Sequence, residues 1–379
     1  MQTGRHFPIP ERPDDVRQLW REARSLSASQ VPPWLDADDA DEYRHIGSVS
    51  LAGLGDADRV AADGEFATLE LARLIVDHDR ATADLHHLYV RRPEPEPIWS
   101  IGLRTGVSPM ALVAPADDRP VLTAADVSDV PASSVADPFL LRHGGRWNMF
   151  LEVVNWRSWK GEIGLATSDD GLRWSYERIV LAEPCHLSYP HVFEADGHIW
   201  MVPESSQLQA VRLYRASRFP YDWDHVADLV SGHPFADATL ARHEGRWWMT
   251  AETSGGSHDT LRLYHAEHLT GPWQEHPASP VVCGDAAIAR PAGRIITADG
   301  RLLRPAQNCT VAYGTDVRLR EITSLTPTTY AEVPCGDDPI IGSGGVAWRA
   351  GGMHHADLHR LDDGTWLAAV DGWRLEDEW

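Results

Sequence analysis

The sequence predicts an all-β fold, a five-bladed β-propeller that follows a small N-terminal helical or α/β appendage. Two observations predict it. A pattern of two strands ending in a carboxylate recurs along most of the chain, and each recurrence has room for four strands in about 50 residues, the size of a propeller blade. Because residues 1–95 lack the pattern, we expect an appendage and linker over residues 1–95 and the propeller over residues 96–379.

Each repeat begins with an apolar strand, a glycine turn and an aromatic strand that ends in a carboxylate. Three strong copies occupy residues 136–152 (ADPFLLRHGGRWNMFLE), 188–204 (SYPHVFEADGHIWMVPE) and 236–252 (ADATLARHEGRWWMTAE). Two weaker copies follow, headed by Arg290 and His355. Alternating apolar residues around a tight glycine turn are typical of β-hairpins.

A second hairpin with a tryptophan after its turn follows each strong copy, at residues 161–177, 209–226 and 260–276. The segment Ile98–Leu103 (IWSIGL) is expected to supply the strand that closes the ring, because closure removes exposed sheet edges. In the appendage, Asp15–Leu26 and Phe66–Arg80 carry apolar residues at helical spacing and predict helices.

The composition limits the class of protein. A formal net charge of −22 argues against nucleic acid or an anionic membrane as a partner, since both require basic surfaces. The chain has no apolar run of membrane-spanning length and no secretory signal at its start, so we expect a cytoplasmic protein. Lys160 is the only lysine, which suggests a GC-rich bacterial genome. The four cysteines form no C-x-x-C pair, so a structural zinc site is not expected.

The repeat also predicts where a site lies. In a propeller blade the first strand lines the central channel and the second runs antiparallel beside it, so the start of one and the end of the other meet at the same mouth. Five acids, one arginine and one histidine are therefore expected there: Asp137, Glu152, Glu204, Asp237, Glu252, Arg290 and His355. Carboxylates crowded in one concavity repel each other and some of their pKa values rise, which suits general acid–base chemistry.

We assign catalytic roles to four of these acids and binding roles to the polar side chains around them. The catalytic candidates are Asp137 as base or nucleophile, Glu252 or Asp237 as acid, and Glu152. The substrate-binding candidates are Tyr189, His191, Glu204, Arg290, Gln307, His355 and Asp371. A structural interpretation stays open: an aspartate at a strand start can bond turn backbone, and a glutamate can pair with an arginine in each blade.

Two features bear on cofactors and on the charge of the ligand. Alternation along a strand puts His355, Asp357 and His359 on one face, where a divalent metal (Ca, Mg or Mn) could bind at His355. A single channel histidine with buried neighbours explains the same pattern. Arg290 stands where other blades carry an acid, and could pair with the acids or hold a phosphate or carboxylate of the ligand.

These segments resemble known families. ADPF, SDDGLRW and LTGPW resemble the blades of glycoside hydrolase family 43. WSIGL, HLSYPHVF, VPESS and MHHADLHRL are more similar to the N-terminal domain of plant glucosamine inositolphosphorylceramide transferase and its bacterial relatives. The resemblance covers about residues 98–374 and implies a five-bladed propeller.

The family 43 resemblance also implies roles for residues of the first three blades. There an aspartate acts as base, a second aspartate adjusts pKa values and a glutamate is the acid. Asp137 matches the base, whereas Tyr189 and Asp237 depart from the pattern in the second and third blades. In some family 43 enzymes a Ca²⁺ lies near a channel histidine, a place that His355 matches.

The sequence therefore predicts a carbohydrate-active enzyme acting at a glycosidic or sugar-phosphate bond, by hydrolysis or transfer. One alternative is a biosynthetic glycosyltransferase that uses a nucleotide-sugar donor. Another is a non-catalytic sugar-binding propeller that serves a partner enzyme, as the plant architecture suggests, because there a separate transferase domain follows the propeller. The expected partner is a sugar, glycoside or nucleotide sugar, and the oligomeric state is left open.

Overall fold

The computed structural model describes residues 43–50, 74–78, 85–91, 97–158, 160–336 and 338–375. The chain separates into two compact units. One comprises Met1–Glu96 with Asp377–Trp379, and the other comprises Pro97–Glu376.

The N-terminal unit contains an antiparallel sheet in the order β1-β3-β2. Its strands are β1 (Tyr43–Ser50), β2 (Leu74–His78) and β3 (Leu85–Arg91). The helix predicted over Phe66–Arg80 is wrong where β2 forms, because the β-branched residues of LIVDH favour extended backbone. The rest of that segment, and the helix predicted over Asp15–Leu26, lie outside the described residues.

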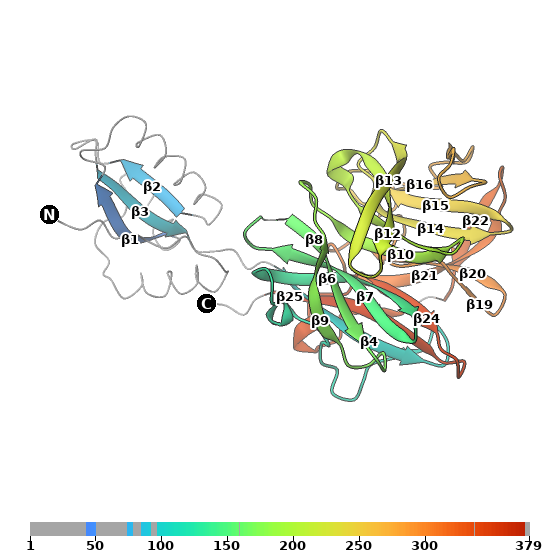
Figure 1. Cartoon of the computed structure of the whole chain (residues 1–379), viewed down its shortest axis with the longest axis horizontal. Helices are drawn as coiled ribbons and strands as arrows, with labels where there is room; N and C mark the ends of the chain where they lie inside the picture. The colour runs from blue at the N-terminus through green and yellow to red at the C-terminus, as the bar shows by residue number, and fades with distance from the viewer. Residues whose placement is uncertain are drawn as a thin grey trace. The chain divides into compact units, whose positions relative to one another are not determined.

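The second unit is a five-bladed propeller of antiparallel sheets, as predicted (Figure 1). The first blade consists of β6 (Ala132–His143), β7 (Arg146–Asn155), β8 (Lys160–Ser168) and β9 (Ser175–Leu181). The second consists of β10 (Ser188–Ala195), β11 (His198–Glu204), β12 (Ala210–Arg218) and β13 (Asp222–Ser231). The third consists of β14 (Ala236–His243), β15 (Arg246–Glu252), β16 (Thr260–Ala266), β17 (Gln274–Glu275) and β18 (Val282–Cys283).

The last two blades complete the ring. The fourth consists of β19 (Ile296–Ala298), β20 (Arg301–Asn308), β21 (Asp316–Leu325), β22 (Tyr330–Pro334) and β23 (Ile341–Gly342). The fifth consists of β24 (Ala356–Arg360), β25 (Trp366–Leu375), β4 (Pro97–Gly106) and β5 (Leu112–Val113). Short 3-10 helices in the described loops are η2 (Ala124–Asp126), η3 (Ser206–Leu208) and η4 (Ala347–Arg349).

The ring is closed by pairing the start of the propeller with its end. β4 lies antiparallel to β25, from Pro97 opposite Leu375 to Gly106 opposite Trp366. The prediction that Ile98–Leu103 supplies the closing strand is thus confirmed, and the closure leaves no open sheet edge between the last and first blades.

A β-bulge recurs at the start of the first strand in three blades. The bulges fall between Ala136 and Phe139, Ser188 and His191, and Ala236 and Thr239. Their first residues have left-handed backbone with φ of +52° at Asp137, +44° at Tyr189 and +52° at Asp237. Aspartate tolerates this region better than tyrosine does, and such conformations persist only where surrounding contacts hold them.

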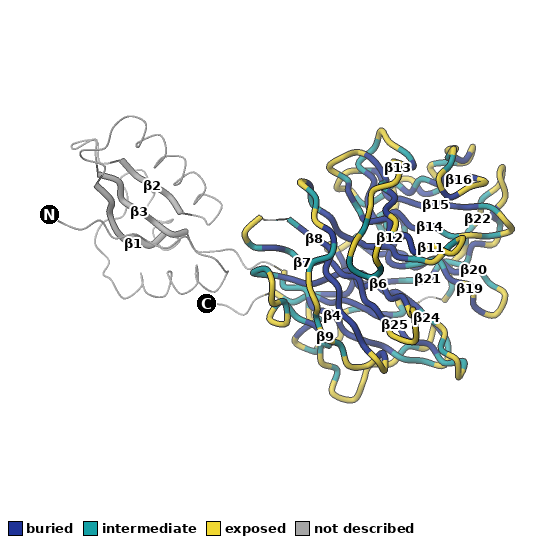
Figure 2. The backbone as a smooth tube through the Cα atoms, viewed as in Figure 1, coloured by how far each residue is buried: buried dark blue, intermediate teal, exposed yellow. Residues whose placement is uncertain are grey.

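Apolar side chains fill the spaces between neighbouring blades. Trp200 and Val202 of the second blade pack with Trp247 and Met249 of the third, and equivalent clusters lie between other blades. The inner strands are accordingly buried, while the turns and the outer strands carry most of the exposed residues (Figure 2).

An ion pair between Arg294 and the fully buried Asp357 joins four blades across the channel. Arg294, ahead of β19, donates from Nη2 to Asp357 at 3.1 Å, to the Leu140 carbonyl at 2.9 Å and to the Val192 carbonyl at 3.4 Å. Asp357 also accepts the Leu140 N–H at 2.7 Å and contacts His359 Nε2 at 2.9 Å. Burial acts to raise the pKa of Asp357, but the charges of Arg294 and His359 outweigh it and hold that pKa well below its ordinary value.

We expect Asp357→Asn to lower the free energy of unfolding by about 3–5 kcal/mol, because it leaves the Arg294 charge buried without its counter-ion. Urea unfolding measures this loss. The control is Arg142→Ala, whose partner Asp362 is 92% exposed, so that pair should contribute little. Equal losses in the two variants would contradict the role assigned to the cross-channel pair.

Candidate active site

In each strong repeat the final glutamate stands 15 residues after the bulge residue (Asp137, Tyr189 or Asp237) and pairs with the residue just before it. Ala136 pairs with Glu152, Ser188 with Glu204, and Ala236 with Glu252. Each glutamate therefore lies beside the bulge residue of its own blade, at the same mouth of the channel. The residues gathered there by hydrogen bonds or charge contacts are Asp137, Glu152, Glu204, Asp237, Arg290, Gln307, His354, His355 and Asp371.

Three carboxylates at the mouth each accept a backbone N–H from the neighbouring blade. Asp371 accepts the Asp137 N–H at 2.9 Å, Asp137 accepts the Tyr189 N–H at 3.2 Å, and Glu204 accepts the Asp237 N–H at 3.2 Å. All three donors are bulge residues. The acids at the mouth thus satisfy the backbone groups that the bulges remove from the strand ladder.

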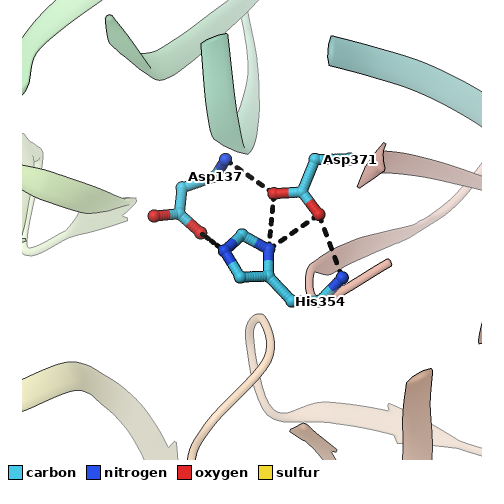
Figure 3. A group of neighbouring side chains, drawn as sticks. All are labelled: Asp137, His354 and Asp371. Carbon is cyan, nitrogen blue, oxygen red and sulfur yellow. Dashed lines mark hydrogen bonds and ion pairs between the residues drawn. The ribbon is translucent and has the colours of Figure 1, made fainter. Parts of the chain in front are cut away.

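His354 lies between two carboxylates (Figure 3). Its Nδ1 is 2.7 Å from Asp371 Oδ2, and its Nε2 faces Asp137 Oδ1 at 3.8 Å. Asp371 Oδ1 also accepts the N–H groups of His354 at 3.2 Å and of His355 at 3.0 Å. Burial acts to raise the pKa of Asp371, but the two histidines and the Asp137 N–H outweigh it and lower that pKa. An ionised Asp371 therefore orients the His354 ring towards Asp137.

Asp137 combines burial with negative neighbours. Burial, followed by the charges of three nearby acids, raises the pKa of Asp137 well above its ordinary value. His355 Nε2 donates to the Pro138 carbonyl at 3.1 Å, while its buried Nδ1 has no hydrogen-bond partner and lies 3.6 Å from Asp137 Oδ1. Burial lowers the pKa of His355 to about 4, so its ring is neutral at neutral pH. The raised pKa favours the protonated form of Asp137, and its carboxyl group faces the lone pair of His355.

The third and fourth blades meet in an ion pair. Arg290 Nε donates to Asp237 Oδ2 at 2.6 Å, and its Nη2 lies 3.5 Å from Glu204 Oε2. Gln307 Nε2 donates to Asp237 at 3.1 Å, and His258 Nδ1 lies 3.0 Å from Arg290 Nη1. Burial raises the pKa of Asp237 to about 6, although the positive charge of Arg290 opposes the rise. The sequence left open whether Arg290 pairs with the acids or holds an anionic group of the ligand, and in the structure it pairs with the acids.

The other two glutamates are held by loop residues. His186 Nδ1 accepts the Gly161 N–H at 2.8 Å, so its Nε2 carries the proton and donates to Glu152 Oε1 at 3.1 Å. Glu252 accepts the Ser254 N–H at 2.5 Å and also the Ser254 hydroxyl. Sequence analysis missed His186 and Ser254, because they lie in loops that no repeat marks. It also missed His354, although the adjacent pair His354–His355 was a signal.

Two predicted substrate-binding residues lie inside the channel wall. The Tyr189 hydroxyl contacts Thr239 Oγ1 at 2.8 Å and accepts the Gly293 N–H at 2.7 Å, and Tyr189 has no exposed surface. His191 Nδ1 accepts the Leu240 N–H at 3.2 Å. Burial, and then a nearby arginine, lowers the pKa of His191 to about 3. Both side chains form the floor beneath the mouth.

The sequence predicted a metal ion at His355, and the side chains near His355 are of types that can bind a metal. Asp137, His354 and Asp371 offer ligand atoms within 4.8 Å of one another. However, both Asp371 oxygens already accept protein N–H groups. Ca²⁺ takes six to eight oxygen ligands and Mg²⁺ a near-ideal octahedron. Because the Asp371 oxygens are occupied, these three side chains offer fewer free oxygen ligands than such an ion requires.

A family model described as glucosamine inositolphosphorylceramide transferase 1, N-terminal, matches residues 92–373. The chain belongs to this family. A protein named glucosamine inositolphosphorylceramide transferase 1 from Oryza sativa subsp. japonica is 35% identical over 306 residues, covering 75% of this chain and 41% of the relative. One of the same name from Arabidopsis thaliana is 33% identical over 307 residues, covering 75% of this chain and 40% of the relative. The family resemblance drawn from the sequence is confirmed, and the chain spans about two fifths of these relatives.

Solved structures of glycoside hydrolases are also similar to this chain. An exo-β-1,3-galactanase from Clostridium thermocellum is 15% identical with a TM-score of 0.46, covering 56% of this chain and 51% of that one. A family 117 glycoside hydrolase from Zobellia galactanivorans is 12% identical with a TM-score of 0.45, covering 74% of this chain and 92% of that one. Likeness at this level assigns no activity.

Two predictions drawn from composition are wrong by these comparisons. The curated relatives are plant proteins rather than bacterial ones, so the scarcity of lysine did not indicate the source. Their name refers to a ceramide lipid, which does not support the cytoplasmic location that we predicted from the lack of a secretory signal and of a long apolar run. Within the described part of the chain, no helix is long and apolar enough to cross a membrane.

We expect stability to fall as the pH decreases from 6.5, partly because of His191. The pKa of this side chain is about 3 in the folded chain against 6.5 for an ordinary histidine, so the unfolded chain binds the proton first. The loss from this residue should be about 2 kcal/mol at pH 5. Urea unfolding at pH 7 and pH 5 measures it. His191→Gln keeps an acceptor for the Leu240 N–H and should reduce the loss, whereas His268→Gln, at an exposed turn, should not; an unchanged loss in His191→Gln would contradict the assignment.

Proposed function

We propose that this propeller is a carbohydrate-active enzyme that acts at a glycosidic bond, with Asp137 as its general acid. The observation that carries the proposal is the buried Asp137, whose pKa is raised well above its ordinary value, next to a histidine that Asp371 orients. A carboxyl group with a raised pKa keeps its proton until a leaving group needs it. This assignment changes the role expected from the sequence, where Asp137 was the base or nucleophile.

Glu152 is the second carboxylate of the proposed mechanism. Its charge is among those that raise the pKa of Asp137, so the two groups lie close enough to interact. His186 Nε2 donates to Glu152 and fixes its orientation. Glycoside cleavage needs two carboxyl groups in different protonation states, one as acid and one as base or nucleophile. Asp137 and Glu152 supply this pair on one blade.

The charges at the mouth support a sugar without a phosphate group. Arg290 is already paired with Asp237 and Glu204, so its positive charge is not free for a phosphate. The remaining acids would repel a phosphate-bearing donor and would accept hydrogen bonds from hydroxyl or amine groups. An amine-bearing sugar is consistent with the word glucosamine in the name of the relatives. This argues against the nucleotide-sugar alternative at this mouth.

A second candidate is a sugar-binding propeller without catalysis. It is favoured by the share of the relatives that this chain spans, about 41%, because the transferase named there includes much more chain. Tyr189, fully bonded within the wall, also stands at a position where an acid would serve catalysis.

We expect Asp137→Asn to reduce kcat about 10²–10⁴-fold while KM changes little, because the amide oxygen still accepts the Tyr189 N–H but no proton can be donated. Turnover of aryl glycosides and of amine-bearing glycosides measures this, with sugar binding followed by thermal shift. Asp362→Asn, an exposed acid far from the mouth, is the control. If the wild type binds sugars but turns over none, the binding candidate replaces the enzyme.

We also expect Asp371→Asn to move the basic limb of kcat/KM to lower pH. The negative charge of Asp371 helps to raise the pKa of Asp137, so its removal should lower that pKa. An acid is lost as the pH rises through its pKa, so activity would decline earlier. A pH–rate profile tests this against Asp196→Asn, whose side chain is 69% exposed. A limb that stays in place, or moves to higher pH, would contradict the role of Asp137.

A further inference from the structure

A loop of the fourth blade, residues 309–315 between β20 and β21, brings Tyr313 over the mouth. The Arg290 guanidinium lies 4.9 Å from the centre of the Tyr313 ring. The rings of His354 and His258 lie 5.1 Å and 5.3 Å away, and that of Trp99 lies 6.0 Å away. Tyr313 therefore contacts side chains of three blades around the site.

Gly314 explains why the loop lies so close. Its φ is +70°, and a Cβ there would come within 2.7 Å of the Trp99 ring and 3.0 Å of His354 Cβ. The Gly314 carbonyl also accepts the Trp373 Nε1–H at 3.1 Å. The backbone beside Tyr313 is thus fixed by contacts with the fifth blade, and the ring position follows from them.

Two parts of the Tyr313 side chain are available to a ligand, the exposed part of its ring and its hydroxyl group. The residue is 38% exposed, although it lies among charged groups. In the described part of the chain, no hydrogen bond joins its hydroxyl to another residue. The surrounding protein atoms and the charges of Asp237 and Asp137 raise the pKa of Tyr313, so the hydroxyl keeps its proton and remains a donor.

We propose that Tyr313 is a specificity-determining residue that contacts the ligand, with its ring against the apolar face of a sugar and its hydroxyl donating to a sugar oxygen. Aromatic rings bind the C–H face of sugars through apolar contact, while the hydroxyl group supplies a polar end. The choice of a sugar rests on the proposed function. The position of Tyr313, between the Arg290–Asp237 pair and His354, is independent of the proposed function.

The experiment compares Tyr313→Phe and Tyr313→Ala with the wild type. The probes are methyl glucoside, methyl galactoside, methyl xyloside and glucosamine, with dissociation constants from ligand-observed NMR titration. Tyr313→Phe should weaken binding about 3–10-fold through the lost hydrogen bond. Tyr313→Ala should weaken it about 10–100-fold, since the ring contact is lost as well. Tyr221→Phe, in the outer hairpin of the second blade, is the matched control and should bind as the wild type does. Circular dichroism and thermal melting verify that each variant is folded.

The outcomes separate this inference from the proposed function. Binding that depends on Tyr313 without any turnover supports the inference and overturns the catalytic proposal. Turnover and binding that both Tyr313 variants retain overturn the inference and leave the catalytic proposal intact. If none of the sugars binds the folded wild type, both are overturned.

Discussion

The site depends on bonds between a carboxylate of one blade and the backbone of the next. Asp371, Asp137 and Glu204 each accept the N–H of a bulge residue across a blade boundary. A left-handed bulge is unfavourable for a non-glycine residue and leaves an N–H outside the strand ladder. The accepting carboxylates compensate for both, so the acids that gather at the mouth also hold the blades in register there.

The contacts that these acids make also explain why their pKa values differ. Asp371 accepts three N–H groups and a histidine, which lowers its pKa. Asp137 accepts one N–H and faces three acids, which raises its pKa. The pKa values of these two aspartates are thus shifted in opposite directions, because burial and negative neighbours dominate at Asp137 whereas the histidines and N–H groups outweigh burial at Asp371.

The sequence predicted those strands and acids that the repeat marks. The repeat correctly placed the end of each second strand beside the start of the first, as in the pair Ala136–Glu152, and IWSIGL forms the closing strand. His186, Ser254 and Tyr313 could not be found in this way, because they sit in loops whose positions depend on tertiary contacts such as the packing of Gly314 on Trp99. The helix expected over Phe66–Arg80 failed for a related reason: apolar residues at helical spacing do not exclude a strand where β-branched residues are frequent.

The mouth has two halves whose acids make different contacts. In the third and fourth blades, Asp237 forms an ion pair with Arg290. In the fifth and first blades, His354 is bonded to Asp371, and the charge of Arg290 acts on Asp137 but is outweighed by burial and by the nearby acids. Tyr189 lies between the halves and closes the channel beneath them with its hydroxyl bonded to Thr239 and Gly293. In the function proposed above, Asp137 transfers the proton on one side of the mouth, and the Arg290 side, with Tyr313 beside Arg290, holds the ligand.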